Sequence, residues 1–125
     1  MSRRVPVRIP PIIPIRLFGP RGSKDVDALV DTGSTYVIVS PEDARDLGYK
    51  PSARVIPIAT AGGIVHAPFL RLHAVEALGF RQQRIPALIK DITASGIEAI
   101  LGWSFLNQYR LTIHATRHWL ELARQ

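Results

Sequence analysis

Apolar and polar residues alternate in short runs along most of the chain, and this pattern predicts a protein made mainly of β-strands. Residues 12–18 are largely apolar, with Arg16 expected to face outward. The turn sequence GPRGSK separates this run from a second one at residues 27–30. The two runs are therefore expected to pair as a hairpin.

The second half of the chain continues the same alternation. Two longer strands are expected within residues 54–80, meeting at a turn formed by residues 60–63. A turn at Gly79 leads into RQQRIPALIKD, a short apolar strand is expected within GIEAILG, and a final hairpin is expected over residues 111–122. Many short strands at regular spacing predict a small closed β-barrel.

Two short helices interrupt this pattern. Ser40 is suited to cap a helix, Pro41 to occupy its first position, and Asp43 to complete a Ser-x-x-Asp capping box. Gly48 then ends this helix, and a second helix of one or two turns is expected at 104–108. The predicted fold class is mostly β, in a single domain over residues 1–125 with its core at about residues 12–122.

An acid interrupts the most apolar part of the pattern, ALVDTGSTYVIVS at residues 28–40. Asp-x-Gly is common in ordinary turns, but leucine, valine and isoleucine flank Asp31 on both sides. A lone ionised carboxylate is costly to bury, so its presence here needs a reason. Thr32 and Ser34 supply hydroxyls that can satisfy a buried backbone, and Gly33 allows another segment to approach closely. These features favour a functional carboxylate at Asp31.

Composition narrows the chemistry. The length of 125 residues fits one domain, and the absence of cysteine excludes disulfides, thiol catalysis and Cys-ligated metals. Prolines and arginines interrupt the apolar residues at the N-terminus, which argues against a signal peptide. No stretch approaches the ~20 apolar residues that a membrane span needs. A cytoplasmic protein with no membrane partner is expected.

A net charge of +6 raises the hypothesis of nucleic-acid binding. The arginines are scattered, however, and no basic block rich in aromatic residues indicates a base-stacking surface. A basic barrel that binds nucleic acid is therefore the weakest hypothesis. The histidines (His66, His73, His114 and His118) form no metal-binding pattern, and no Gly-x-Ser-x-Gly motif occurs. No metal, cofactor or nucleic-acid partner is expected.

VDTGS, followed from Ala99 by AILG, resembles the half-domain of the aspartic proteases over about residues 12–122. In that family an apolar-apolar-Gly strand packs beneath the Asp-Thr-Gly loop, and a short helix follows it. The resemblance implies a small closed β-barrel of the acid-protease half-domain type. It assigns the supporting strand to Ile100, Leu101 and Gly102. It also implies a glycine-tipped hairpin, the flap, at Ala61, Gly62, Gly63 and Ile64.

Aspartic proteases need two facing carboxylates that share one proton, and one of them acts as the base on a bound water. This chain contains a single Asp-Thr-Gly. The resemblance therefore implies a homodimer in which Asp31 meets its own copy, as in the single-domain, retropepsin-like members. It further implies that Thr32 reaches the partner's loop, that Gly33 permits close approach, and that Ser34 donates to the carboxylate. The implied function is a cofactor-free endopeptidase acting on an extended peptide or protein.

Two positions differ from the viral members of this group. Viral members usually carry an acid two residues after the glycine of the loop and an arginine after the apolar-apolar-Gly element, where this chain has Thr35 and Trp103. The loss of both charges together avoids a buried, unpaired charge and resembles the cellular and bacterial forms. An alternative from another class stays open: a peptide-binding or dimerisation module, catalytically weak or inactive, on the same fold. The glycine-rich hairpin tip is also typical of an ordinary tight turn.

Overall fold

The computed structural model describes residues 1–50 and 52–124. Its strands are β1 (Ser2–Pro6), β2 (Ile12–Gly19), β3 (Gly22–Val30), β4 (Val37–Val39), β5 (Val55–Thr60), β6 (Gly63–Ala77), β7 (Phe80–Ile89), β8 (Ala99–Leu101), β9 (Tyr109–His114) and β10 (Trp119–Arg124). The helices are α1 (Pro41–Asp46) and α2 (Trp103–Leu106), with a 3-10 turn at Thr93–Ser95.

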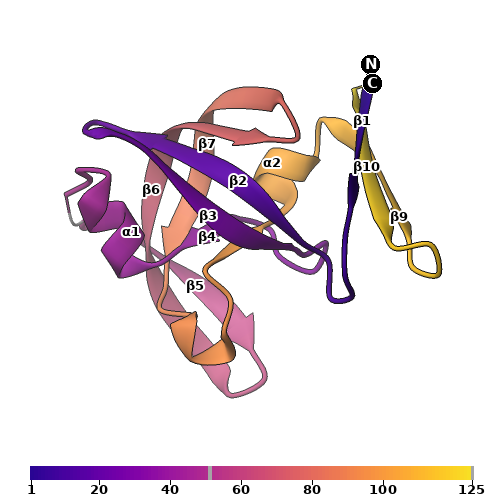
Figure 1. Cartoon of the computed structure of the whole chain (residues 1–125). Coiled ribbons are helices and arrows are strands. Elements are labelled where there is room, and N and C mark those ends of the chain that lie inside the picture. The colour runs from indigo at the N-terminus through magenta and orange to yellow at the C-terminus, as the bar shows by residue number, and fades with distance from the viewer. Residues whose placement is uncertain (51, 125) are drawn as a thin grey trace.

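Six of these strands close into a barrel (Figure 1). They follow the order β2-β3-β8-β4-β7-β6, and β6 pairs back onto β2. β2 and β3 form the expected hairpin, while β3 runs parallel to β8 and β4 runs parallel to β7. The prediction of a mostly β fold with a small closed barrel and two short helices is confirmed.

Burial explains why these segments are strands. In β2, Ile13, Ile15 and Leu17 are buried while the residues between them are exposed, so one face of the strand lies in the core. The short strand β4 is buried at all three positions because it crosses the middle of the sheet. Apolar burial of this kind is the main favourable contribution to folding.

The two helices begin close to where the sequence predicts. Ser40 caps α1, since its Oγ accepts a hydrogen bond from the Asp43 amide at 3.0 Å. α2 begins at Trp103, one residue before the predicted start, and ends at Leu106. No helix in the described part of the chain has the length and apolar character that a membrane crossing requires.

A second sheet, joining the two ends of the chain, was not predicted. Its order is β1-β10-β9, and β1 pairs with β10 from Ser2 with Ala123 to Pro6 with Trp119. Figure 1 shows it beside the barrel, with both termini at its upper end. The predicted final hairpin is present but longer. Leu120 and Leu122 of β10 are fully buried and attach this sheet to the core.

The β5–β6 hairpin extends below the barrel in Figure 1. β6 pairs with β5 from Gly63 to Pro68, and from Phe69 onward it pairs with β7. β5 has no other strand partner in the described residues. The hairpin is therefore a two-stranded ribbon that joins the barrel through β6.

Candidate active site

Asp31 follows β3 directly and opens the loop that joins β3 to β4. Its amide donates to the Leu101 carbonyl at 3.1 Å, which fixes the start of the loop on β8. The Ser34 amide donates to the Asp31 carbonyl at 3.2 Å, and the Gly33 amide donates to Asp31 Oδ1 at 2.8 Å. The carboxylate is half-buried, so it is held in place by the loop and still faces the surface.

The first turn of α2 holds the other half of this loop. The Trp103 amide donates to the Ser34 carbonyl at 2.9 Å, and the Ser104 amide donates to the Thr35 carbonyl at 2.8 Å. These amides are free to bond outside the helix because the first turn of a helix leaves its N–H groups unpaired. The loop is therefore held between β8, which lies in the predicted supporting segment, and α2, which follows that segment.

Gly102 makes this arrangement possible. A Cβ at this position would lie 2.5 Å from the Ser34 carbonyl oxygen and closer still to that of Tyr36. Only glycine fits such a close approach of two backbones. Ile100 and Leu101 lie in β8, where Leu101 is fully buried and Ile100 borders the space beside Asp31. The structure thus places all three predicted supporting residues directly beneath the loop.

Ser104 also holds the site together, a role that was not predicted from the sequence. Its Oγ accepts a hydrogen bond from the Val37 amide at 2.9 Å and donates to the Pro86 carbonyl at 2.7 Å. One hydroxyl therefore links α2, β4 and β7. Both partners are remote in the sequence, so no local pattern could have revealed the contact.

The expected bond from Ser34 to the carboxylate is wrong for this chain. Ser34 Oγ donates to the Tyr36 carbonyl at 2.7 Å, two residues along the loop. Serine hydroxyls commonly bond to nearby backbone in this way, and the Gly33 amide serves the carboxylate instead. Thr32 and Gly33 are exposed on the loop surface. Their roles across an interface therefore stay predictions.

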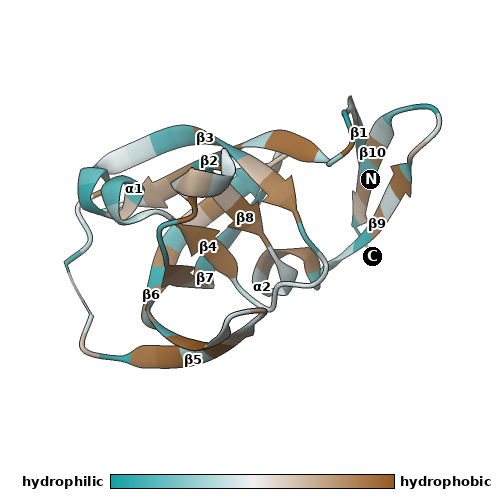
Figure 2. Cartoon of the chain, turned by 90° about the horizontal axis from the view of Figure 1, so that it is seen from below, coloured by the Kyte–Doolittle hydropathy of each residue, from teal (hydrophilic) through white to brown (hydrophobic). Residues whose placement is uncertain are grey.

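A cleft of about 370 Å³ separates the loop from β5 of the hairpin. Asp31 supplies the single carboxylate among its lining residues as far as the structure describes them. The cleft is otherwise lined by small, apolar and hydroxyl-bearing side chains: Gly33, Ser34, Thr35, Tyr36, Ile38, Pro57, Ile58, Ala59, Leu88 and Ile100. Figure 2 shows β5 coloured as largely apolar, like β4 and β8, although its residues are alternately exposed and half-buried.

The predicted flap residues lie at the tip of the β5–β6 hairpin. Thr60 pairs with Gly63, which leaves Ala61 and Gly62 as the turn. Gly63 has a φ of +116°, a conformation that favours glycine. Ile64 follows the turn with 69% of its surface exposed. The hairpin is present where the sequence predicts it, and its role as a flap stays a prediction.

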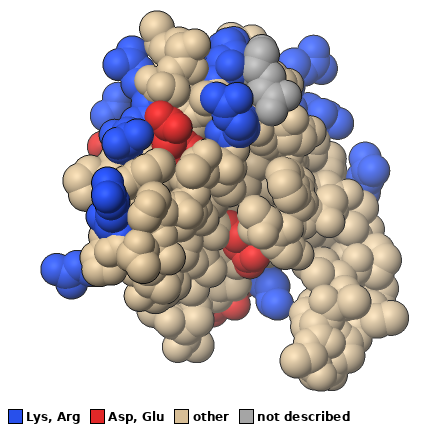
Figure 3. Space-filling view, turned by 90° about the vertical axis from the view of Figure 1, so that its right-hand side faces the viewer, with Lys and Arg blue, Asp and Glu red and all other residues tan. Residues whose placement is uncertain are grey.

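Two large apolar side chains are exposed near the Asp31 loop. Trp103 is 44% exposed beside the loop, and Ile12, at the start of β2, is 38% exposed. The Val30 amide donates to the Pro11 carbonyl at 2.9 Å, so the segment before β2 lies against the last residue of β3. On the face shown in Figure 3, lysine and arginine gather over the upper half and the margins, and the lower half carries fewer charges, among them acidic groups near its centre.

The described residues include no group of three or more His, Cys, Asp or Glu side chains placed to hold a metal ion. The cleft presents one carboxylate, oriented by the Gly33 amide and facing largely apolar walls. Such a carboxylate can act as a base on a water molecule, but it has no acid beside it within the described chain.

Comparison with known proteins identifies the family and the fold of this chain. Residues 13–105 match the family model described as aspartyl protease. A crystal structure of a retropepsin-like aspartic protease from Rickettsia conorii is similar to this chain with a TM-score of 0.69 and 22% sequence identity, over 98% of each chain. A search of curated proteins finds no match. The chain belongs to the aspartyl protease family, and its fold is that of a retropepsin-like aspartic protease.

Proposed function

We propose that this chain is a homodimeric aspartic endopeptidase, with Asp31 of each copy forming one half of the catalytic pair. The proposal depends on one observation. Asp31 is only half-buried, and it lies in a cleft whose described lining contains no other carboxylate. A two-fold axis beside the loop would supply the missing acid from an identical surface. The apolar surface at Trp103 and Ile12 is the kind that a second copy would cover.

In this mechanism the two Asp31 carboxyl groups share one proton, because two like charges at contact distance cannot both ionise. The ionised group takes a proton from water as the water oxygen attacks the peptide carbonyl carbon. The protonated group donates its proton to the carbonyl oxygen. The carboxyl group that took the proton from water then gives it to the amide nitrogen, while the other carboxylate takes a proton from one hydroxyl of the tetrahedral intermediate. The C–N bond breaks, which yields a carboxylic acid and an amine.

The structure of the cleft favours an extended, apolar peptide as substrate. Ile38, Ile58 and Ile100 line its walls, so apolar side chains on either side of the scissile bond would be removed from water. The hairpin opposite Asp31 presents a strand to which a peptide backbone can bond. Closure of this hairpin over the peptide would also exclude water from the reacting bond.

The test is the substitution Asp31→Asn, with Asp27→Asn as its matched control. Asp27 is an exposed acid of β3, four positions away, and lies outside the cleft. Asp31→Asn is expected to abolish cleavage of an apolar peptide library while the fold, followed by circular dichroism, is kept. Asp27→Asn should leave cleavage unchanged. The active particle should have twice the mass of one chain when measured by sedimentation.

Cleavage that persists in Asp31→Asn, or an active particle that is strictly monomeric, would reject this assignment. A binding module is the second candidate, because the apolar walls of the cleft can bind a peptide without any cleavage at Asp31. In that case the unmodified protein and Asp31→Asn should bind an apolar peptide equally well, and neither should release fragments.

A further inference from the structure

A second groove lies on the opposite side of the β5–β6 hairpin from Asp31. We call it the outer groove, and its cavity measures about 500 Å³. It is lined by residues of α1, β6 and the end of β7: Pro41, Ala44, Arg45, Tyr49, Lys50, Val65, His66, Ala67, Pro68, Ile89, Lys90 and Asp91. The catalytic cleft is lined by β5 but not β6, and the outer groove by β6 but not β5. The hairpin therefore stands between the two cavities.

The outer groove opens where the β6–β7 ladder divides. Phe69 is the last residue of β6 paired with β7, opposite Leu88. Beyond it β7 turns toward β4, with Ile89 opposite Val39 and the Lys90 amide donating to the Val39 carbonyl at 3.0 Å. From Gly63 to Pro68, β6 is paired with β5 alone among the described strands. One edge of this segment is thus open, and open edges bind extended chains by adding a strand.

Charge indicates what kind of chain would bind there. Arg45, Lys50 and Lys90 carry three positive charges around the groove. Asp91 is the sole acid of its described lining, and its carboxylate already accepts hydrogen bonds from the Thr93 hydroxyl and amide, at 2.6 and 3.0 Å. These bonds hold the pKa of Asp91 below its usual range.

The floor of the groove is apolar. It is formed by the buried residues Ala44 and Ala67 and by the half-buried Ile89. Side chains of an added strand point alternately to opposite faces. A segment in which acidic and apolar residues alternate would therefore place its apolar side chains on this floor and its carboxylates among the three cations. An extended acidic-apolar peptide matches both the shape and the charge of the outer groove.

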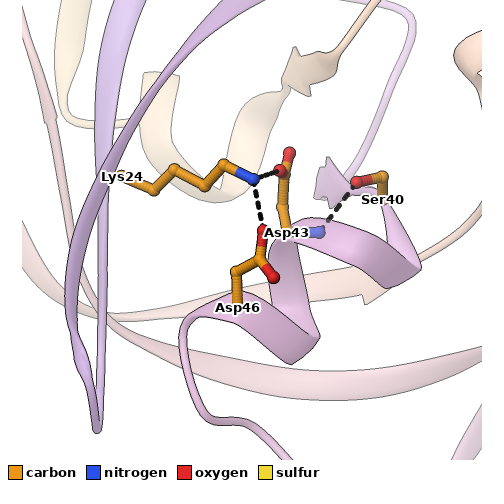
Figure 4. Close-up of polar contacts among 4 residues, drawn as sticks. All are labelled: Lys24, Ser40, Asp43 and Asp46. Atoms are coloured by element: carbon orange, nitrogen blue, oxygen red, sulfur yellow. Dashed lines mark hydrogen bonds and ion pairs between the residues drawn. The ribbon is translucent and has the colours of Figure 1, made fainter.

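One wall of the groove is firmly held. Figure 4 shows Lys24 of β3 between two acids of α1, with Nζ 2.6 Å from Asp43 Oδ1 and 2.6 Å from Asp46 Oδ2. The Ser40 cap fixes the start of the same helix. The opposite wall is the hairpin, whose β5 strand pairs only with β6 in the described chain. A ligand that fills the groove therefore contacts a fixed helix on one side and a less supported hairpin on the other, so the hairpin is the wall that can move.

We infer that the outer groove is a binding site for an extended acidic-apolar segment of another protein, which adds a strand to the open edge of β6 at residues 63–68. Because the hairpin also forms one side of the catalytic cleft, occupancy of the outer groove changes the position of the hairpin and hence the binding of substrate. The binding site depends only on the open strand edge, the apolar floor and the three cations. Its effect on cleavage rests on the proposed endopeptidase function.

The experiment uses the full chain with Asp31→Asn, so that a bound peptide is not consumed. The probe is a fluorescent peptide that alternates glutamate and valine, and the control probe alternates lysine and valine. The acidic probe is expected to bind, and its binding should weaken as salt is raised. Amide hydrogen exchange at residues 63–68 should slow in the complex. Equal binding of both probes, or no change of exchange there, would overturn the inference.

Charge reversal at the rim provides a matched pair of variants. The double variant Lys50→Glu with Lys90→Glu should weaken binding of the acidic probe about tenfold, because two attractive charge contacts with the probe become repulsive. Arg110→Glu with Arg117→Glu makes the same change of net charge on exposed residues of β9 and the turn after it, and should leave the affinity unchanged. Thermal melts establish that each variant folds. Equal weakening by both pairs would show only non-specific attraction and would reject the site.

Failure of this inference is distinguishable from failure of the proposed function. If the unmodified chain cleaves peptides and the acidic probe does not bind, the outer groove is rejected and the endopeptidase stands. If the probe binds to Asp31→Asn and the unmodified chain cleaves nothing, the binding site stands and its regulatory effect is rejected. When both hold, the acidic probe should change the KM for an apolar substrate, and the lysine probe should not.

Discussion

The two sides of the cleft at Asp31 are built in opposite ways. Its floor, the Asp31 loop, is held by backbone hydrogen bonds to β8 and α2 and by the hydroxyl of Ser104. Its roof, the β5–β6 hairpin, extends from the barrel as a two-stranded ribbon with exposed apolar residues such as Val55 and Ile64. A two-stranded ribbon is marginally stable by itself, whereas a loop fixed at several points keeps one geometry.

This difference matches the roles proposed for the two parts. A catalytic carboxylate works only if it is held to within a fraction of an ångström of its productive position. A cover over an extended peptide must instead open and close. Substitutions in the floor should therefore cost stability, and substitutions in the roof should affect peptide cleavage while stability changes little.

The largest effect is expected from a pair of glycine substitutions, one on each side. Gly102→Ala should lower the free energy of unfolding by about 3 kcal/mol or more, because its Cβ would collide with the backbone of the loop. Gly62→Ala meets no atom closer than Thr60 Oγ1 at 4.0 Å and should change stability by less than about 0.5 kcal/mol. Urea denaturation measures both. Similar losses in the two variants would contradict the proposed contrast.

Hydroxyl removal is expected to give the next effect. Ser104→Ala leaves the Val37 amide and the Pro86 carbonyl without their partner, and should cost about 2 kcal/mol. Peptide cleavage should fall as well, since Val37 directly follows the loop that holds Asp31. The roof counterpart is Thr60→Ala, which removes an exposed bond to the Gly63 carbonyl and should cost less than about 0.5 kcal/mol. If the two substitutions lower the free energy of unfolding by similar amounts, the hydrogen bonds of Ser104 do not hold the floor of the cleft as described.

Local patterns in the sequence were enough to predict the outline of this contrast. Ser40, Pro41 and Asp43 give the start of α1 because capping depends on neighbouring residues alone. The apolar alternation gives β2, since burial of one face repeats at every second residue, and the turn residues at 60–63 give the hairpin at residues 55–68. Asp31 and the strand beneath it were identifiable through their order and spacing along the chain.

Features that depend on remote contacts were not predictable in this way. β1 was missed because arginines and prolines interrupt its apolar residues, and because its strand character comes from pairing with β10 at the other end of the chain. The two bonds of Ser104 join residues far apart in sequence. The outer groove is likewise assembled from three separate segments, so it exists only in the folded chain.

A smaller effect is expected at Lys24, which tests whether the rigidity of the floor extends to α1. Hydrogen bonds to Asp43 and Asp46 raise the pKa of Lys24, and the bond from Lys24 lowers the pKa of Asp46 below its ordinary value of 3.8. A carboxyl group whose pKa is lower in the folded state stabilises the fold above its ordinary pKa. This stabilisation is lost as the pH falls through the folded pKa.

Lys24→Met should therefore lower the melting temperature by on the order of a few degrees near neutral pH. The difference from the unmodified chain should shrink below pH 3.8, as Asp46 becomes protonated in both proteins. Lys90→Met is the matched control, since Lys90 lies across the outer groove and outside this cluster. A difference between Lys24→Met and the unmodified chain that stays constant from neutral pH to pH 3 would contradict the assigned ion pairs.

The smallest effect on stability, and the sharpest test of the roof, is expected from Ile64→Ala. Ile64 is 69% exposed, so little apolar area is lost from the core and the free energy of unfolding should change by less than about 0.5 kcal/mol. The value of kcat/KM for an apolar peptide should nevertheless fall severalfold, because the side chain at the hairpin tip is free to pack on bound substrate. Ile113→Ala removes an exposed isoleucine from β9 and should change neither quantity. Equal kcat/KM values for the two variants would mean that the exposed apolar tip does not take part in binding peptide, and the division into a fixed floor and a working roof would be wrong.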